Sequence, residues 1–367
     1  MRKQDLFMKN RKKMTAVLIS IVLGAALLSG CGQTKSVEEQ VTEELLGKDK
    51  SEPAKAPVKE KIPAPDQSGD KTIKIDDKEI VIKDYGSAVA DGSDNVESSL
   101  ADDAELQIVF LGDSILDNYR DDTGIAYLTG DACNAAVYNL AMGGTTAALD
   151  TYARSGYDEW DTRNFTGVVN AICGDVDPSF MDGYRAREVF DMADFSKTDY
   201  FVIEYGVNDF MAGIPIMRDN TQPFDQYSYA GAVRYGVEKL KTTFPDAMVI
   251  FVTPVYTQFW NGSVWVGDVN TVNNGYGTLF DYICAGYNAA IDAGGYCIDG
   301  YSCMGIDTYT ASDDLEDGIH LSVYGRQKYA AYLSHIINKE EGREDTEWSW
   351  DNWNGWGEYI SWVRSFL

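Results

Sequence analysis

The chain has 367 residues, of which 44% are hydrophobic and 12% aromatic, enough for at least one large domain with a buried core. Its 58 acidic residues against 31 basic ones give a formal net charge of -27 at neutral pH. A surface this acidic repels phosphate backbones and anionic lipid headgroups, which argues against nucleic-acid binding and favours a neutral substrate.

The first 30 residues have the pattern of an export signal. Six basic residues precede an apolar stretch at about 15–28, which is too short for a comfortable membrane span, and Leu28-Ser29-Gly30-Cys31 follows. This ending resembles the lipobox of bacterial lipoproteins, and the resemblance implies cleavage before Cys31 and acylation of its thiol. A diacylated cysteine holds a protein on a membrane, so we expect an extracytoplasmic protein anchored to the bacterial cell membrane through Cys31. The alternative is a plain signal peptide with an incidental cysteine.

The next two segments predict little packed structure. Residues 31–71 are rich in Lys, Glu, Pro, Ser and Ala and have almost no aromatic side chains. Such a composition cannot bury enough apolar surface to offset its ordering entropy, so we expect a flexible linker. Around Ile75 and Ile80 apolar and polar residues alternate, which predicts a small hairpin followed by a second linker, together 72–104.

From residue 105 the chain alternates short apolar runs with helical patterns. An apolar run bounded by turn residues predicts a buried strand, and apolar residues three to four positions apart predict a helix. Strands that alternate with helices predict a parallel sheet with helices on both faces, here in one domain over 105–340. The strands are expected at 106–111, 137–142, 200–205, 248–252 and 296–298, and the main helices at 229–244, 279–293 and 322–338.

Five cysteines follow Cys31, and an odd number in an exported protein leaves at least one thiol free. Cys297 and Cys303 are close enough in the sequence to close a small loop, but buried free thiols are the interpretation that we favour. No cysteine pair has zinc-ligand spacing, and the acidic run at 312–316 lacks the spacing of a calcium loop. We therefore expect neither a metal nor a cofactor, and we interpret the acidic run as solvated loop charge.

A serine follows the first buried strand directly, in Gly112-Asp113-Ser114. Ligands of an open parallel sheet bind at the carboxyl ends of its strands, and Ser114 should lie there at the start of a helix. A serine needs a base to act as a nucleophile, and the chain has only two histidines. His320 is in a predicted loop, with Asp317 three residues before it, a spacing at which a carboxylate can contact the ring. His335 is inside the last helix with no acid at a matching spacing, so we interpret it as a surface or packing residue.

Two further turns follow strands of the same predicted sheet. Gly206-Val207-Asn208-Asp209 follows the third strand, where the Asn208 amide can donate a hydrogen bond to an oxyanion. Residues 139–146 follow the second strand, and the glycines in this segment let a backbone N–H approach a ligand closely. Either segment on its own is more often just a turn.

These four segments, in this order, resemble the four blocks of the SGNH or GDSL hydrolase family, which supply Ser, Gly, Asn and His. The resemblance covers about 106–338 and implies a flavodoxin-like three-layer α/β/α fold with a parallel sheet. It also implies that Ser114 attacks an ester carbonyl, that His320 takes and returns the proton, and that Asp317 orients His320. The Gly-x-Ser-x-Gly elbow of α/β-hydrolases is absent. The matching segments are Gly112-Asp113-Ser114-Ile115-Leu116, 139–146, Gly206-Val207-Asn208-Asp209 and Asp317-Gly318-Ile319-His320.

The same resemblance implies the donors of an oxyanion hole. They are the backbone N–H of Ser114, the side chain of Asn208 and the backbone N–H of one glycine. Counting from Asn139, Gly144 fits the family's glycine better than Gly143, but the chain has two adjacent glycines where many members have one.

The chain is longer than compact members of the family. Ser114 and Asn208 are 94 residues apart, and we expect insertions at 150–198 and 256–278, both rich in aromatic residues. Aromatic rings among polar groups suit sugar faces, although packing onto the core is at least as good an interpretation. Residues 341–367 hold five of the eight tryptophans, and we expect this tail to dock on the domain rather than to bind glycan or an interface.

The sequence therefore predicts an extracytoplasmic serine esterase that hydrolyses O-acyl esters, above all O-acetyl groups on carbohydrate, through an acyl-enzyme. The expected partners are an acylated carbohydrate or another small ester, and a membrane through the lipid anchor at Cys31. Three alternatives stay open: a lipase or lysophospholipase, an O-acyltransferase of the same family, and a surface glycan-binding lipoprotein without activity.

Overall fold

A computed structural model of the protein describes residues 71–75, 78–82, 104–149, 163–344 and 346–366, all within the unit formed by 63–367. The predicted export signal, Cys31 and nearly all of the predicted linker lie outside these ranges. Within them, no helix combines the length and the apolar character that a membrane span requires.

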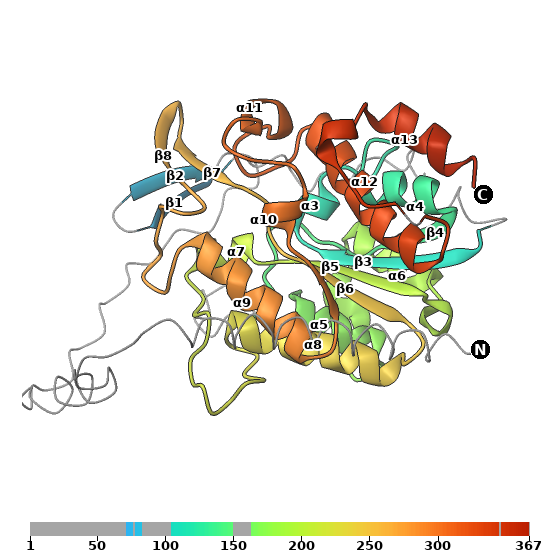
Figure 1. The fold of residues 1–367 in the computed structure, drawn as a ribbon. Coiled ribbons are helices and arrows are strands. Elements are labelled where there is room, and N and C mark those ends of the chain that lie inside the picture. The colour runs from blue at the N-terminus through green and yellow to red at the C-terminus, as the bar shows by residue number, and fades with distance from the viewer. Residues whose placement is uncertain (1–70, 76–77, 83–103, 150–162, 345, 367) are drawn as a thin grey trace, which may run out of the picture. The chain divides into compact units, whose positions relative to one another are not determined.

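Five parallel strands form the central sheet. They are β3 (Leu106–Gly112), β4 (Ala135–Asn139), β5 (Tyr200–Glu204), β6 (Met248–Val252) and β9 (Tyr296–Ile298). Their spatial order is β4-β3-β5-β6-β9, which is the order 2-1-3-4-5 of flavodoxin-like folds when the strands are counted along the chain (Figure 1). All residues of β3 are buried, because both faces of the sheet are covered. The predicted flavodoxin-like α/β class is therefore confirmed.

Helices cover both faces of this sheet (Figure 1). On one face lie α4 (Ile125–Cys133) and α12 (Val323–Glu340), which pack against each other. On the other face lie α5 (Phe165–Ile172), α8 (Tyr229–Thr243) and α9 (Leu279–Asp292), with α8 packed between its two neighbours. The sheet and the two helical layers form the predicted three-layer arrangement.

Side-chain caps determine where two of the long helices begin. Thr278 and Asp281 form a capping box at the start of α9, and the Ser322 hydroxyl accepts a hydrogen bond from the Gly325 N–H at the start of α12. The helices α8 (Tyr229–Thr243), α9 and α12 agree with their predicted ranges to within two residues.

Short elements join the strands to the helical layers. Two of them, α3 (Ser114–Asp117) and α7 (Val207–Ala212), follow β3 and β5 directly and so begin at the carboxyl end of the sheet. Of the predicted insertion at 150–198, the structure describes 163–198, which contains α5 and α6. The other short elements are α6 (Arg185–Met192), α10 (Gly300–Cys303), α11 (Ala311–Asp314) and the 3-10 turns η2 (Pro178–Met181), η3 (Phe195–Lys197) and η4 (Trp350–Asn352).

Two antiparallel hairpins accompany the sheet. The first, β1 (Lys71–Ile75) with β2 (Lys78–Ile82), forms where the alternating pattern predicts a hairpin. The second, β7 (Gln258–Asn261) with β8 (Val264–Asp268), occupies the predicted insertion at 256–278. Contacts join β2 to both β7 and β8, so the two hairpins lie side by side (Figure 1).

The acidic run at 312–316 is only partly solvated, and its interpretation as solvated loop charge is wrong for Asp314. Asp314 is fully buried and accepts a hydrogen bond from the Lys328 ammonium at 2.8 Å. Glu316 accepts one from Arg326 at 3.2 Å. The reason is that α12 places both cations directly beneath the run, which pairs its charges.

All five cysteines that the structure describes carry free thiols, so the small Cys297–Cys303 loop is not formed. Cys133 is fully buried, and burial raises the pKa of its thiol to about 12. Cys284 is exposed, which departs from the expectation that the thiols are buried.

The tryptophan-rich tail packs on α4 and α12. Its helix α13 (Trp356–Val363) forms a small apolar cluster with Ala132 of α4 and Ala331 of α12. Trp350 Nε1 donates a hydrogen bond of 2.8 Å to the carbonyl oxygen of Cys303. In this arrangement the tail covers apolar surface of the helical layer.

Candidate active site

Ser114 follows the end of β3 and begins the four-residue helix α3. The preceding Asp113 is the N-cap of this helix, and its Oδ1 accepts a hydrogen bond of 3.0 Å from the Ile115 N–H. Because a single helical turn has little macrodipole, the expected electrostatic effect at Ser114 comes only from the backbone N–H groups at the start of α3.

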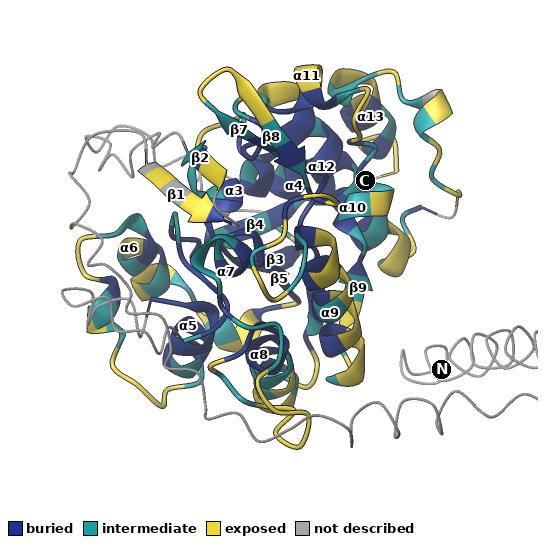
Figure 2. Cartoon of the chain, turned by 90° about the vertical axis from the view of Figure 1, so that its left-hand side faces the viewer, coloured by how far each residue is buried: buried dark blue, intermediate teal, exposed yellow. Residues whose placement is uncertain are grey.

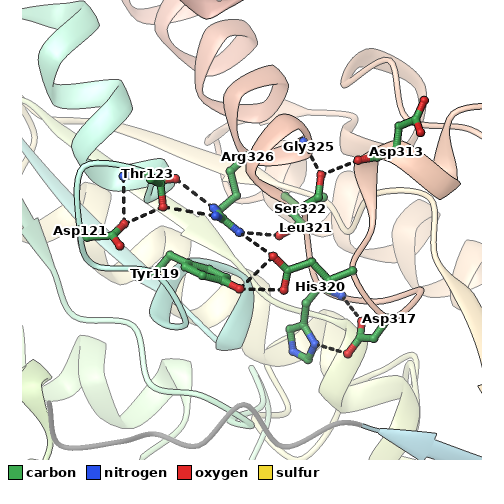
Figure 3. Close-up of polar contacts among 11 residues, drawn as sticks. Tyr119, Asp121, Thr123, Asp313, Asp317, His320, Leu321, Ser322, Gly325 and Arg326 are labelled. Atoms are coloured by element: carbon green, nitrogen blue, oxygen red, sulfur yellow. Dashed lines mark hydrogen bonds and ion pairs between the residues drawn. The ribbon is translucent and has the colours of Figure 1, made fainter.

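His320 joins Ser114 to Asp317. Its Nε2 lies 2.9 Å from Ser114 Oγ, and its Nδ1 lies 2.7 Å from Asp317 Oδ2. The other carboxylate oxygen of Asp317 accepts hydrogen bonds from the backbone N–H groups of Ile319 and His320, at 2.9 and 2.7 Å. This turn holds the Asp317 carboxylate beside the Nδ1 atom of the ring (Figure 3). A serine hydroxyl, an imidazole and a carboxylate in this geometry can generate a nucleophile.

The pKa of Asp317 shows which protonation state this turn favours. Burial alone raises the pKa, but the hydrogen bond and the charge of His320, together with the two backbone N–H groups, lower it further than burial raises it. The pKa of Asp317 is therefore below its ordinary value, and the group is an anion at neutral pH.

His335 lies apart from these residues, as the sequence predicts for a packing residue. It is buried in α12, but it does have an acidic partner, since its Nδ1 lies 2.5 Å from Glu344 Oε1. Helical spacing could not show this acid, because Glu344 follows the helix and folds back onto it. The ring centroid of His335 lies 5.1 Å from that of Trp348 in the tail.

The turn after β4 approaches Ser114 closely. A Cβ atom added to Gly143 would lie 3.8 Å from the Cβ of Ser114. The Gly143 N–H donates a hydrogen bond of 2.7 Å to Asp117 Oδ2. Gly144 has a φ of 74°, which glycine adopts readily, and this angle turns the chain so that the Thr145 N–H bonds back to Met142. Because Asp117 already binds the Gly143 amide, Gly144 is the better candidate for an oxyanion donor.

Asn208 connects this turn to Asp113. Its Nδ2 donates to Asp113 Oδ2 and to the carbonyl oxygen of Thr145, both at 3.0 Å. The neighbouring Asp209 accepts hydrogen bonds from the N–H groups of Ala147 and Ala148, at 2.8 and 3.0 Å. The structure thus brings Asn208 and the glycine turn together at the carboxyl end of β3, where Ser114 lies.

Three buried carboxyl groups, those of Asp113, Glu204 and Asp209, lie near Ser114, and none of them has a predicted role. Desolvation raises the pKa of Asp113 to about 6 and that of Asp209 to about 7. Desolvation, with the charge and hydrogen bond of Asp113, raises the pKa of Glu204 well above its ordinary value. Glu204 is the last residue of β5 and pairs in register with Gly112, which explains its closeness to Asp113. Glu204 therefore keeps its proton to a higher pH than an exposed glutamate does.

We expect Glu204→Gln to make the protein less sensitive to alkaline pH. A raised pKa in the folded state contributes stability that is fully present below the unfolded pKa and is lost as pH rises through the folded pKa, with each pKa unit worth about 1.4 kcal/mol. The substituted glutamine would keep a hydrogen-bond donor towards Asp113 but cannot ionise. Chemical denaturation at pH 5 and pH 8 should show that the variant gains stability over the wild type as pH rises. The exposed Glu238→Gln serves as control, and an equal difference at both pH values would contradict the interpretation.

Arg326 of α12 holds two loops of the site together, and nothing in its sequence context indicated this. Its Nε donates to the Thr123 carbonyl oxygen at 2.9 Å, and its Nη1 donates to the Leu321 carbonyl oxygen at 2.7 Å (Figure 3). Its guanidinium carbon lies 3.4 Å from the ring centroid of Tyr119, whose hydroxyl donates to Glu316 at 2.7 Å. Arg326 is buried, and its hydrogen bond to Leu321 is shielded from solvent, whereas the hydrogen bond between Tyr119 and Glu316 is exposed.

The contacts of Arg326 with Tyr119, Thr123, Leu321 and Glu316 form a clamp that connects the loops of Ser114 and His320. Tyr119 and Thr123 lie in the loop after α3, which begins with Ser114. The N–H of Glu316 donates to the carbonyl oxygen of His320 at 2.8 Å, so the clamp also holds the His320 loop. Among the described residues, no group of three or more His, Cys, Asp or Glu side chains could hold a metal ion.

Comparison with known proteins identifies the family of the chain. Residues 108–333 match the family model of the GDSL-like lipase/acylhydrolases, and none of the curated proteins compared with the chain matches it. Among solved structures, the chain is similar to a family two carbohydrate esterase from Clostridium thermocellum in complex with cellohexaose (18% identity over 65% of each chain, TM-score 0.41). It is also similar to a lipase/acylhydrolase from Enterococcus faecalis (18% identity over 66% of this chain and all of that one, TM-score 0.38). Since the family model spans more than half of the residues, the chain belongs to the GDSL-like lipase/acylhydrolase family.

Proposed function

We propose that the protein is a serine esterase that hydrolyses carboxylic esters through an acyl-enzyme on Ser114. One observation carries this proposal: Ser114 Oγ lies within hydrogen-bond distance of His320 Nε2, and Asp317 holds the other ring nitrogen. Membership of an acylhydrolase family supports the same reaction class.

The geometry supports the following acylation step. Ser114 Oγ attacks the ester carbonyl while His320 Nε2 takes the hydroxyl proton, and Asp317 stabilises the imidazolium that forms. The tetrahedral oxyanion is held by the N–H groups of Ser114 and Gly144 and by the Asn208 amide. Because both N–H bonds of that amide already serve Asp113 and Thr145, one of them is shared with the oxyanion.

The alcohol then leaves, and water hydrolyses the acyl-enzyme. His320 gives its proton to the leaving alkoxide, and the ester C–O bond breaks to leave an acyl group on Ser114. Water then attacks the acyl carbonyl as His320 takes one of its protons. The bond between Ser114 Oγ and the acyl carbon breaks, His320 returns the proton to Oγ, and the carboxylic acid and free Ser114 result. Every proton in this cycle is carried by the substrate, by water or by a side chain of the triad.

We propose O-acyl groups on carbohydrate, above all O-acetyl groups, as the substrate class. The net charge of -27 favours a neutral substrate over a phosphorylated one. An acylated polymer outside the cell also suits the proposed location of the protein, which is extracytoplasmic and tethered through acylated Cys31.

The substitution Cys31→Ser should release the protein from the membrane fraction into the medium, and continued membrane association would contradict the anchor.

The substrate proposal is tested by acetate release from a panel of acetylated polysaccharides, with p-nitrophenyl acetate as a small reference ester and Ser114→Ala as control. We expect the wild type to release acetate and the variant to be inactive. Preference for long-chain acyl esters would indicate a lipase, and acyl transfer to an added alcohol in place of hydrolysis would indicate a transferase. Binding of glycan with equal background rates for both proteins would indicate an inactive binding protein.

A further inference from the structure

The β7–β8 hairpin touches the loop that carries the acid and the base. The Gln258 N–H donates a hydrogen bond of 2.7 Å to the carbonyl oxygen of Gly318, which lies between Asp317 and His320 in the sequence. A Cβ atom on Gly318 would lie 2.5 Å from the Gln258 oxygen and 2.8 Å from Trp260 Cδ1, and the φ of this glycine is 93°. The hairpin and this loop are thus in direct backbone contact, so a ligand bound on the hairpin lies next to the proposed reaction centre.

The two tryptophans of this hairpin lie opposite each other beside a bulge. The strand register shifts between Phe259, which pairs with Gly267, and Trp260, which pairs with Trp265. Phe259 is fully buried and packs on Phe210 at a centroid distance of 5.4 Å. Bulges of this kind redirect side chains and are frequent beside active sites. Here the extra residue is Val266 of β8, so that Trp265 lies opposite Trp260.

Trp265 is the exposed member of this pair. Its ring meets that of Trp260 edge to face, with centroids 5.2 Å apart and an interplanar angle of 79°. It remains 47% exposed and is the second residue of β8, whose first part is coloured as exposed in Figure 2. Such T-shaped packing fixes the orientation of a ring without covering its other face. Trp265 therefore presents a flat, preoriented aromatic surface to the solvent.

The hairpin is also rigid at its base. The Val269 N–H donates to the Thr257 carbonyl oxygen at 2.9 Å, and the Tyr256 hydroxyl donates to Asp268 Oδ2 at 3.2 Å. Contacts of β2 with both of its strands support the hairpin further. A supported aromatic ring loses little conformational entropy when a ligand stacks on it.

We propose that Trp265, backed by Trp260, is a carbohydrate subsite on which a pyranose ring of the acylated glycan stacks while an O-acyl group of the chain reaches Ser114. This inference rests on the proposed esterase function and names its substrate class. The C–H face of a pyranose carries partial positive charge and matches the negative face of an indole. The acidic surface of the chain disfavours an anionic lipid layer as the alternative occupant.

The experiment compares Trp265→Ala and Trp265→Phe with the wild type on two substrates, p-nitrophenyl acetate and a soluble acetylated xylan. Stacking of one ring is worth about 1.4 kcal/mol, which corresponds to a tenfold change in affinity. We expect Trp265→Ala to raise KM for the polysaccharide about tenfold and to leave kcat/KM for the small ester within about twofold. Trp265→Phe should restore most of the loss.

Tyr296→Ala is the matched control, because Tyr296 is 40% exposed but begins β9 at the opposite, amino end of the sheet. Its KM for the polysaccharide should be unchanged. An unchanged KM for Trp265→Ala, or equal losses on both substrates, would overturn the inference. A loss confined to micellar fatty-acyl esters would overturn it too, because the ring would then serve a lipid.

A binding measurement separates this inference from the proposed function. Native gels cast with the xylan, before and after removal of its acetyl groups, report binding without turnover. Should the wild type hydrolyse no ester, the esterase proposal fails, while retardation that depends on Trp265 still supports the subsite. A wild type that hydrolyses p-nitrophenyl acetate but neither uses nor binds the polysaccharide would overturn the subsite and leave the esterase proposal standing.

Discussion

Asp317→Asn is expected to lower kcat about 10⁴-fold while the protein stays folded. The asparagine keeps one oxygen to accept the backbone N–H groups of Ile319 and His320, so the turn can persist. Its amide nitrogen, however, faces Nδ1 of the ring at the position of the present 2.7 Å contact. The ring then has to accept there, and its proton moves to Nε2, where it faces Ser114 and cannot serve as a base.

The measurement is kcat for p-nitrophenyl acetate, with the free energy of unfolding determined in parallel. Asp313→Asn is the matched control, because Asp313 is an exposed acid in the same segment whose backbone carbonyl, not its carboxylate, accepts the Ser322 hydroxyl. Its kcat should be that of the wild type. A loss below about tenfold for Asp317→Asn would show that Asp317 does not set the tautomer of His320.

Arg326→Met is expected to reduce both stability and activity, although Arg326 touches neither Ser114 nor His320 in the described contacts. The substitution keeps the aliphatic volume but removes the donors to Thr123, Leu321 and Glu316. Leaving the buried carbonyl oxygen of Leu321 without its donor costs about 1–3 kcal/mol. Since misplacement by about 1 Å can cost 10²-fold in rate, we also expect kcat to fall at a temperature where the variant is fully folded.

Two further variants separate positioning from general destabilisation. Arg326→Lys keeps the positive charge but loses the planar guanidinium with its several N–H donors. It should therefore recover part of the lost stability and a smaller part of the lost kcat. Arg234 forms an ion pair of 2.9 Å with Asp292 on the outer helical layer, and Arg234→Ala should leave kcat unchanged and cost at most about 1 kcal/mol. The positioning role would be excluded if folded Arg326→Met retained the kcat of the wild type.

The sheet was predictable because its signals are local. Each strand is a short apolar run, and in a sheet buried on both faces nearly every residue of such a run is apolar, as in β3. The hairpin formed by β7 and β8 was not predicted, because in the sequence its aromatic residues resemble packing residues. Its bulge and its contact with Gly318 depend on the register of two strands, which no local pattern gives.

The proposed triad was accessible from the sequence for a different reason. With only two histidines in the chain, His320 could be matched to Asp317 by spacing and to Ser114 by the order of the family's blocks. The groups that support these residues were missed because they act across long separations. Tyr119 and Glu316 are 197 residues apart, and Glu204 approaches Asp113 only through the pairing of β3 with β5. Asp314, which resembles solvated charge in the sequence, is a buried partner of Lys328 in α12.

The most direct test of the account is to trap the nucleophile. Incubation with a p-nitrophenyl phosphonate ester, followed by intact mass measurement and peptide mapping, reports which side chain attacks an activated acyl-like centre. The account predicts one adduct per chain on Ser114, none on Ser114→Ala, and a loss of esterase activity of at least about 10⁴-fold in that variant. An adduct on another residue, or ester hydrolysis that persists in Ser114→Ala, would contradict it.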